Sequence, residues 1–326
     1  MNTVRSRRPQ MAKLQITKLR DSMNGVVVID KPPGLTSHDV VNRVRRILGQ
    51  RSVGHLGTLD PSATGVLPIV LGNLTRLAQF YAQSEKTYEG VIRFGFATNT
   101  YDADGEPTTP LQDVHINCDE VRTLAAQFHG VIEQMPPPFS AKKIAGVPAY
   151  KLARKNQEVA LKPVQVEIKE FEILDTTADQ ATFRARVASG TYIRSVAHDM
   201  GQKLGCGAHL ASLRRTAVAE FSIEDAHTLQ ALETAMQQGM AESSLAGSSL
   251  AESMFVHPRK LVPQLPCVTA SEESAALIRS GRAVNLPEMS RAPQVKVFYG
   301  QRDLIAIATR IAGTLFHPRI VFTGEN

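Results

Sequence analysis

Apolar residues follow two different periods along the first two thirds of the chain, and each period predicts its own kind of element. Residues 25–31 are a short apolar run that predicts a buried strand. Residues 36–48 carry an apolar stripe at helical spacing, and we expect Thr36 or Ser37 to cap this helix and Gly49 to end it. Further elements are predicted as helices at 74–83, 119–129, 192–204 and 228–236, and as strands at 88–96, 164–174 and 181–188. The mixture predicts an α/β fold of the mixed α+β kind, built around a central sheet.

The pattern changes towards the end of the chain. Residues 210–221 are predicted to form a strand pair with Arg214 and Arg215 at the bend. Residues 237–255 are rich in serine and glycine and predict a linker. Beyond it, residues 256–326 are punctuated by proline, and their short apolar runs predict a small all-β module: 295–298, 304–308 and 320–322. We therefore expect a large and a small folded domain, at 23–236 and 256–326.

Two stretches are basic and lack the periodicity of a folded core. Residues 1–22 predict a flexible tail that either contacts phosphate or is merely solvated. Residues 133–163 contain the block 136–138 of three prolines, which excludes regular structure, followed by six cations: Lys142, Lys143, Lys151, Arg154, Lys155 and Lys162. An insertion that grips an anion and a solvated helical arm explain this stretch equally well.

Composition narrows the class of protein without defining its chemistry. Hydrophobic residues make up 43% of 326, and the net charge of +6 with a pI of 9.3 favours an anionic partner such as nucleic acid. The three cysteines form no CxxC pair and no zinc pattern, so we expect reduced thiols, no metal and a cytoplasmic location. No apolar run approaches the length of a membrane span, and no apolar segment follows the N-terminal arginines as in a signal peptide.

A loop at residues 54–68, GHLGTLDPSATGVLP, contains three glycines and two prolines in fifteen residues. Its single carboxylate is Asp60, which Pro61 biases towards extended backbone. Apolar side chains within the loop predict that it packs on a core: Leu56, Leu59, Val66 and Leu67. A lone carboxylate on an anchored loop is a catalytic candidate, although an aspartate that caps a turn is the more frequent situation.

Four stretches carry a resemblance to one family. They are DKPPG at 30–34, the loop GHLGTLDPSATGVLP, QMPPPFSAKKIAGVPAYKLAR at 134–154 and SGTYIRSVAHDMGQKLGCGAHLASLRRTAVAEF at 189–221. From about residue 23 onward the chain closely resembles the TruB-type tRNA pseudouridine synthases, which act on uridine 55 of the T loop. Two departures concern packing, since Phe139 stands where Tyr is expected and Ala219 where Gly is usual.

The resemblance implies a pseudouridine synthase fold with a central mixed/antiparallel sheet and, from position and strand pattern alone, a PUA-like β-barrel at 256–326. It implies that Asp60 is the essential carboxylate of an isomerisation that breaks the N1–C1′ bond, rotates the base and joins C5 to C1′. Such a reaction needs no redox step, so we expect no cofactor. Whether Asp60 attacks C1′ or C6, or acts as a base at C2′, stays open. The implied partner is the T-arm stem-loop of tRNA, bound by a monomer.

The resemblance also implies roles around the target base, which must leave its stack to be reached. Tyr88 would stack on the extruded base, and His55 would fill the space that the base vacates. Leu213 would form an apolar wall of the pocket. Without the resemblance, Tyr88 is equally a core aromatic on a strand, and a lone histidine is more often structural.

The remaining implied residues surround the carboxylate. Arg194 would pair with Asp60 and hold it oriented. Tyr192 would contact the base and assist loss of the C5 proton, and Lys31 would lie near the site. Asp102, in a polar turn, is a weaker candidate for the site, and a structural role is the more frequent situation for such a residue.

Two other functions remain in view. A glycosidase would need a second carboxylate beside Asp60, whereas the resemblance implies an arginine there, which is no general acid near neutral pH. A non-catalytic RNA-binding or chaperone protein could share the same basic surfaces, either as a rival or as an added role.

Overall fold

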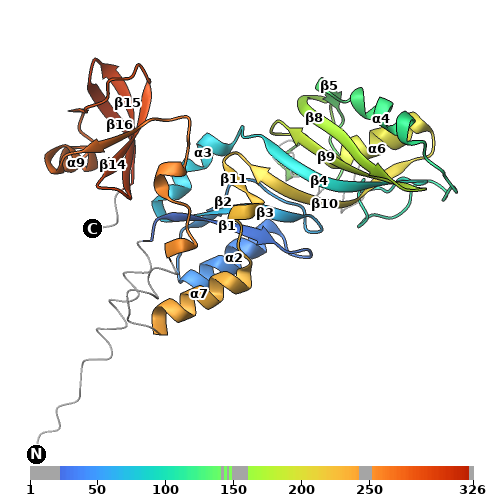
Figure 1. Cartoon of the computed structure of the whole chain (residues 1–326), viewed down its shortest axis with the longest axis horizontal. Coiled ribbons are helices and arrows are strands. Elements are labelled where there is room, and N and C mark those ends of the chain that lie inside the picture. The colour runs from blue at the N-terminus through green and yellow to red at the C-terminus, as the bar shows by residue number, and fades with distance from the viewer. Residues whose placement is uncertain (1–22, 141–142, 145–146, 149–160, 242–251, 323–326) are drawn as a thin grey trace, which may run out of the picture.

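The computed structural model describes residues 23–140, 143–144, 147–148, 161–241 and 252–322. Within them the chain forms a long sheet flanked by helices and, at one end, a smaller C-terminal unit (Figure 1). The predicted tail 1–22 and much of the predicted insertion 133–163 lie outside the described residues. In the described part of the insertion, β6 (Lys143–Ile144) pairs with β7 (Val147–Pro148).

The long sheet contains nine strands among the described residues. Its main path runs β1, β3, β10, β4, β9, β8, β5, while β2 pairs with β3 and β11 with β10. Among the strand pairs described in this sheet, β3 and β10 alone are parallel, which confirms the predicted central mixed/antiparallel sheet. The bounds are β1 Gly25–Lys31, β2 Val53–His55, β3 Thr64–Leu71, β4 Lys86–Phe94, β5 Gly130–Gln134, β8 Val164–Thr176, β9 Gln180–Val187, β10 Ala208–Val218 and β11 Phe221–Ser222.

The strand β1 is apolar at successive positions because both of its faces are covered. Val27 and Ile29 belong to a core cluster that includes residues of two helices, α2 (Ser37–Leu48) and α7 (Leu229–Ala241). Val26 and Val28 belong to a second cluster, which reaches into the C-terminal unit. In Figure 1, α2 and α7 lie side by side below β1.

Local signals define the helices around the sheet. Thr36 caps α2 by accepting from the Asp39 amide, and Gly49 ends the helix in the left-handed conformation at φ 62°. Gly205 ends α6 (Ile193–Leu204) at φ 75°. A further helix, α4 (Cys118–Ala126), packs on β8, while α6 packs on β10. These helices were all predicted from periodicity.

Three elements of the structure differ from those that the sequence predicts. The strand pair with a bend at Arg214 and Arg215 is wrong, because both residues lie inside the continuous strand β10, between β3 and β4. The turn comes later, at Ala219 with φ 49°, before β11. The helix predicted at 74–83 is a 3-10 helix, η1 (Gly72–Leu77), followed by the single turn α3 (Ala78–Tyr81). Helix α7 runs to Ala241 and so occupies the start of the predicted linker.

The C-terminal unit is a five-stranded sheet in the order β12, β14, β15, β16, β13. Its strands are β12 Cys267–Ala270, β13 Val284–Asn285, β14 Gln294–Tyr299, β15 Asp303–Ala312 and β16 Leu315–Val321. The expectation of an all-β module is wrong in one respect, because α9 (Glu272–Arg279) lies between β12 and β13. Ser271 caps that helix, and Ala275 and Ile278 are buried against the sheet.

A buried polar contact joins the two units. The amide of Val262, just after the 3-10 helix η3 (Pro258–Lys260), donates to the hydroxyl of Tyr81 and to Oε1 of Glu220, both at 2.9 Å. The Tyr81 hydroxyl in turn donates to Glu220 at 2.5 Å. Leu261, Phe298 and apolar residues of both units pack around this contact. The C-terminal unit is therefore docked through a shared core.

Candidate active site

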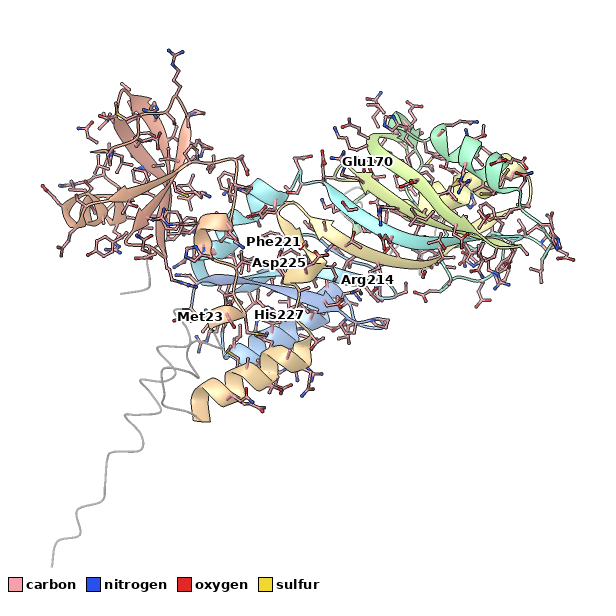
Figure 2. All side chains as sticks on the ribbon, in the orientation of Figure 1. Met23, Glu170, Arg214, Phe221, Asp225 and His227 are labelled. Carbon is pink, nitrogen blue, oxygen red and sulfur yellow. The ribbon has the colours of Figure 1, made fainter. Side chains whose placement is uncertain are left out.

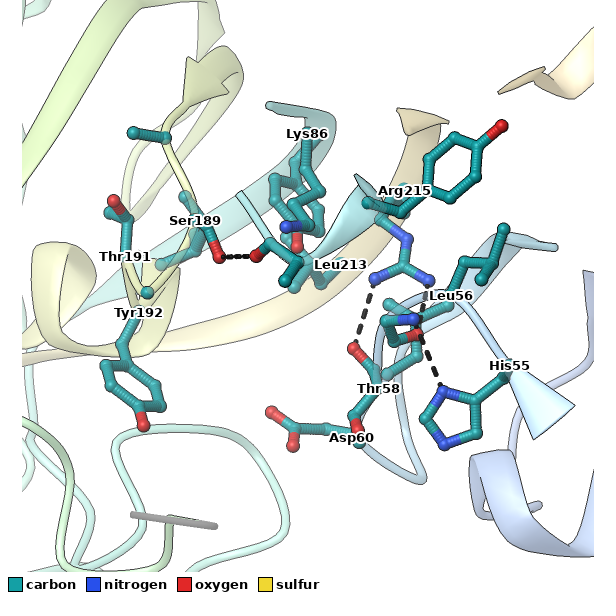
Figure 3. A pocket seen from close by; sticks show the side chains of 18 of the residues that line it. His55, Leu56, Thr58, Asp60, Lys86, Ser189, Thr191, Tyr192, Leu213 and Arg215 are labelled. Carbon is teal, nitrogen blue, oxygen red and sulfur yellow. Dashed lines mark hydrogen bonds between the residues drawn. The ribbon is translucent and has the colours of Figure 1, made fainter. Parts of the chain in front are cut away.

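A cavity of about 360 Å³ opens beside the long sheet (Figure 3). Six of the seven residues predicted for the site line it: His55, Asp60, Tyr88, Tyr192, Arg194 and Leu213. They come from the end of β2 and the loop after it, from β4, from the N-cap and first turn of α6, and from β10. The fold thus collects residues that are more than 150 positions apart in the sequence.

The backbone on both sides of Asp60 is held by buried groups. Ser37, at the start of α2, accepts from the amide of Leu59 at 2.8 Å and donates to its carbonyl at 3.1 Å. The carbonyl of Pro61 accepts from the Gly34 amide and from the ammonium of Lys31, each at 2.9 Å. The loop is therefore anchored, as its apolar residues predicted, and the carboxylate of Asp60 remains 42% exposed.

Lys31 lies near the site, as the resemblance implies, but it is not among the residues that line the cavity. Its side chain has no exposed surface, and its ammonium donates to the carbonyls of Pro32, Leu35 and Pro61 at 2.7–2.9 Å. Burial lowers the pKa of Lys31 to about 8, and the nearby charge of Asp60 offsets part of that effect. Because backbone carbonyls already accept all three of its N–H donors, Lys31 stabilises the loop that carries Asp60.

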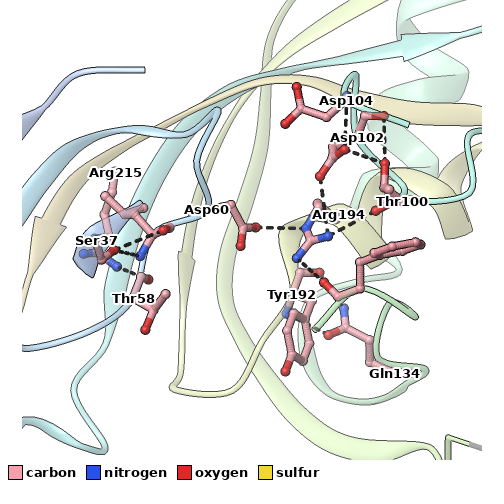
Figure 4. A network of polar contacts seen from close by, with 12 residues as sticks. Ser37, Thr58, Asp60, Thr100, Asp102, Asp104, Gln134, Tyr192, Arg194 and Arg215 are labelled. Carbon is pink, nitrogen blue, oxygen red and sulfur yellow. Dashed lines mark hydrogen bonds and ion pairs between the residues drawn. The ribbon is translucent and has the colours of Figure 1, made fainter. Parts of the chain in front are cut away.

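Arg194 lies between two carboxylates (Figure 4). Its Nε is 3.0 Å from Oδ2 of Asp60, and its Nη1 is 3.4 Å from Oδ2 of Asp102. The same guanidinium donates to the carbonyls of Thr100 and Phe139 at 3.2 and 3.1 Å. Since both carboxylates and both carbonyls fix its plane, Arg194 holds one oxygen of Asp60 and leaves the other side of that carboxylate towards the cavity.

Asp102 was expected to be structural, and its contacts tie it directly to Arg194. It accepts from the hydroxyl of Thr100 at 2.5 Å and from the Asp104 amide at 3.2 Å, and its side chain is 13% exposed. Burial raises the pKa of Asp102, while Thr100 and Arg194 offset part of the shift. The preceding residue, Tyr101, has φ 66°, so this turn is strained where it presents Asp102. That conformation has no local sequence signal such as glycine.

Tyr192 precedes α6 and is positioned through its backbone. The side-chain amide of Gln134 binds this backbone through two hydrogen bonds. Its Nε2 donates to the Tyr192 carbonyl at 3.0 Å, and its Oε1 accepts from the backbone amide of Tyr192 at 2.8 Å. Gln134 has no exposed surface. Gln134 stands two residues before the proline block 136–138, and its position in the stretch QMPPPFS is the local signal for this role.

His55 and Tyr88 both line the cavity. Burial, and next the charge of Arg215, lowers the pKa of His55, so the ring is neutral near pH 7. Its Nδ1 accepts from the Gly57 amide at 3.3 Å, which leaves the proton on Nε2. Tyr88 lies on β4, directly across from Arg215 of β10, and is 9% exposed.

A second, smaller cavity of about 80 Å³ also borders the Arg194–Asp60 pair and is lined in addition by Asp102 and Ser212. It has room for a few water molecules but not for a sugar ring. The two carboxylates share one buried arginine, and Asp102 does not line the large cavity. This arrangement does not provide the pair of carboxylates on either side of a bond that a glycosidase requires.

Sequence comparisons give the family. A profile described as TruB family pseudouridylate synthase (N terminal domain) matches residues 45–193, and one described as tRNA pseudouridylate synthase B C-terminal domain matches residues 194–253. A protein of Solibacter usitatus named tRNA pseudouridine synthase B is 47% identical over 302 residues, which cover 92% of this chain and 100% of that protein. Another of that name, from Burkholderia mallei, is 37% identical over 332 residues, which cover 99% and 100%. The chain belongs to the TruB family of pseudouridylate synthases.

Solved structures agree on the fold. A chain of the archaeal box H/ACA sRNP Nop10-Cbf5 complex superimposes with a TM-score of 0.67 at 25% identity, covering 94% of this chain and 88% of that one. A chain of an H/ACA RNP bound to a substrate RNA containing 2′-deoxyuridine gives a TM-score of 0.69 at 24% identity, covering 94% and 87%. The pseudouridine synthase fold, predicted by resemblance, is confirmed. Among the described residues no helix is long and apolar enough to cross a membrane.

Proposed function

We propose that this protein isomerises the uridine at position 55 in the T loop of tRNA to pseudouridine. The observation that carries the proposal is the ion pair at 3.0 Å between Arg194 and Asp60 at the cavity of a TruB-family chain. The reaction conserves atoms, since the N1–C1′ bond breaks, a C5–C1′ bond forms, C5 loses its proton and N1 gains one. One oriented carboxylate is sufficient for it.

Asp60 is the reacting group in each of the three available paths. It attacks C1′, attacks C6, or removes the proton at C2′, and all three need an ionised carboxylate with a free oxygen. Arg194 orients Asp60 by pairing with one of its oxygens, and the anchors on Leu59 and Pro61 keep the loop in place.

The target base enters the cavity after leaving the T loop. Extrusion costs a few kcal/mol, and stacking on Tyr88 returns roughly 1–3 kcal/mol. Leu213 and Tyr192 line the cavity around the base, and Tyr192 assists loss of the C5 proton. His55, neutral because of its lowered pKa, fills the space that the base leaves in the RNA.

Basic regions outside the cavity bind the rest of the RNA. The C-terminal unit, residues 256–326, contains nine Lys and Arg against five Asp and Glu, and we assign it as a PUA-like RNA-binding domain. The lysines and arginines of the insertion 133–163 act as a thumb on the RNA backbone, and the tail 1–22 adds further positive charge. We assign the whole as a cytoplasmic monomer that needs no cofactor or metal.

The test is to incubate the protein with a T-arm stem-loop and map pseudouridine by position. We expect conversion at position 55 and at no other uridine, and none in a matched stem-loop that carries cytidine there. Conversion at another position would overturn the assigned site. Binding and refolding of the RNA without any pseudouridine would favour a protein that acts only as an RNA chaperone.

A further inference from the structure

Arg215 is the largest fully buried side chain among the described residues. Its Nε donates to the carbonyl of Val66 at 2.8 Å, its Nη1 to that of Thr58 at 3.0 Å and its Nη2 to that of Gly57 at 3.0 Å. No carboxylate of the described chain forms an ion pair with it. A buried guanidinium without an anion is costly, so the three carbonyls must compensate for much of its desolvation.

These three carbonyls lie on both sides of Asp60. Gly57 and Thr58 precede it in the loop, and Val66 follows it in β3. One side chain therefore joins the two ends of the loop that carries Asp60. Figure 3 shows the guanidinium directed at this loop from β10.

The sheet register fixes where Arg215 stands. Its backbone pairs with Gly65 of β3 on one side and with Tyr88 of β4 on the other. Gly65 has φ 100°, and a Cβ there would lie 2.2 Å from the Arg215 carbonyl, so only glycine permits this approach. Arg215 is thus placed between the Asp60 loop and the tyrosine that we assign to base stacking.

We infer that Arg215 is a positioning residue, which holds the Asp60 loop in its reactive geometry against the strand that carries Tyr88. Contact with an RNA phosphate is the competing role, because the guanidinium borders the cavity. The complete burial of the side chain and the use of three of its five N–H donors by backbone carbonyls favour positioning. The effect on catalysis that we expect from this role rests on the proposed function.

The test compares Arg215→Lys with Arg214→Lys. Lysine keeps the charge but presents one nitrogen, which cannot reach carbonyls on both ends of the loop. Arg214 (Figure 2) is the matched control, because it precedes Arg215 in β10, is 42% exposed and forms its ion pair with Asp30. Its contact with the Asp60 loop is at one end, through the Thr64 hydroxyl at 3.4 Å, so it does not join the two ends as Arg215 does.

Two readouts are measured on each full-length variant. In single-turnover reactions with a T-arm stem-loop, we expect Arg215→Lys to lose about 10- to 100-fold in rate constant, as a misplacement near 1 Å does. Its RNA dissociation constant should change less than about threefold. In hydrogen exchange without RNA, peptides over residues 55–63 should exchange faster, while those over α4 stay unchanged. We expect Arg214→Lys to match the wild type in rate and exchange.

Each contrary result is distinct. A wild-type rate with unchanged exchange in Arg215→Lys would overturn the inference. A loss of RNA affinity that equals the loss in rate, with unchanged exchange, would make Arg215 an RNA-binding cation. Faster exchange everywhere, α4 included, would assign Arg215 to global stability. Because exchange needs no RNA, failure of the proposed reaction leaves the loop measurement able to support or reject the positioning role.

Discussion

Arg194 places its Nε 3.0 Å from Oδ2 of Asp60 while remaining almost fully buried, with 7% of its side chain exposed against 42% for the carboxylate. The cation is thus fixed inside the protein and the anion stands at the cavity. Charge pairs of this kind are strong because the buried partner loses little entropy when the contact forms. The geometry presents Asp60 as a carboxylate whose orientation is set before any substrate arrives.

The second carboxylate on Arg194 should matter for rate. Asp102→Asn removes the negative charge 3.4 Å from Nη1 and leaves the guanidinium with one anionic partner instead of two. We expect the single-turnover rate constant to fall about 10- to 100-fold, since small displacements of a catalytic group are costly, with RNA affinity little changed. Asp104→Asn is the control, because Asp104 is exposed and contacts Asp102 through its backbone amide alone. Equal rates in both variants would show that Asp102 only shapes its turn.

Tyr88 and His55 should act on the extruded base and not on bond cleavage. Tyr88→Leu removes the ring and should reduce activity strongly, because stacking worth roughly 1–3 kcal/mol is lost. Tyr88→Phe keeps the ring, so RNA binding should survive even if proton handling slows. His55→Ala should be milder than Asp60→Asn in single-turnover kinetics, because other side chains can fill space. If His55→Ala is as inactive as Asp60→Asn, then His55 transfers a proton and the space-filling role is wrong.

The stability of the protein should depend on pH through Asp199. Burial raises the pKa of this carboxyl to about 6, and the charge of Lys203 offsets part of the shift. Because the folded state then holds a proton that the unfolded state has lost, the contribution of Asp199 to stability falls as pH rises from about 4 to 6.

The variant Asp199→Asn removes this penalty. Its free energy of unfolding should match that of the wild type near pH 4 and exceed it above pH 6.5, by about 1 kcal/mol after discounting for the solvent that screens a half-exposed group. Thermal unfolding across pH 4–8 measures the difference, with the exposed Asp113→Asn as control. A difference that stays constant with pH would contradict the raised pKa.

The contact between the two units should contribute to stability. Glu220→Ala leaves the buried amide of Val262 and the hydroxyl of Tyr81 with one acceptor fewer, at a cost of about 1–3 kcal/mol. Calorimetry should show a lower unfolding midpoint, with the C-terminal unit affected most. Glu224→Ala, an exposed neighbour, should unfold as the wild type does. Identical curves for both variants would mean that apolar packing alone docks the unit.

The sequence predicted elements whose signals are local. The capping of α2 by Thr36 and its end at Gly49 depend on residues within the helix and its flanks, so pattern was enough. Arg215 was misplaced at a bend, because two adjacent arginines suggest an exposed turn. Its partners lie about 150 residues earlier in the chain, and no local pattern reports them. The short helix α9 was missed because strand-like runs surround its eight residues.

In the candidate site too, residues with a local motif could be predicted, whereas contacts between distant parts of the chain could not. Family motifs identified Asp60, Arg194 and the cavity residues, whereas the burial of Lys31 depends on a carbonyl thirty positions away, at Pro61. The contact of Asp102 with Arg194 could not be predicted either, because the two residues meet only when α6 and the strained turn at Tyr101 are assembled. Contacts such as those of Lys31 and Asp102 join residues that are distant in the sequence, so no local pattern predicts them.

The most direct test of the account is the comparison of wild type and Asp60→Asn on one T-arm stem-loop, with single-turnover conversion and RNA affinity measured side by side. The amide is nearly isosteric but is a poor nucleophile and base, so we predict a rate constant at least about 100-fold lower. RNA affinity should stay within a few-fold, and Asp104→Asn should behave as the wild type. Conversion by Asp60→Asn at more than about a hundredth of the wild-type rate would contradict the assignment of Asp60 as the reacting carboxylate.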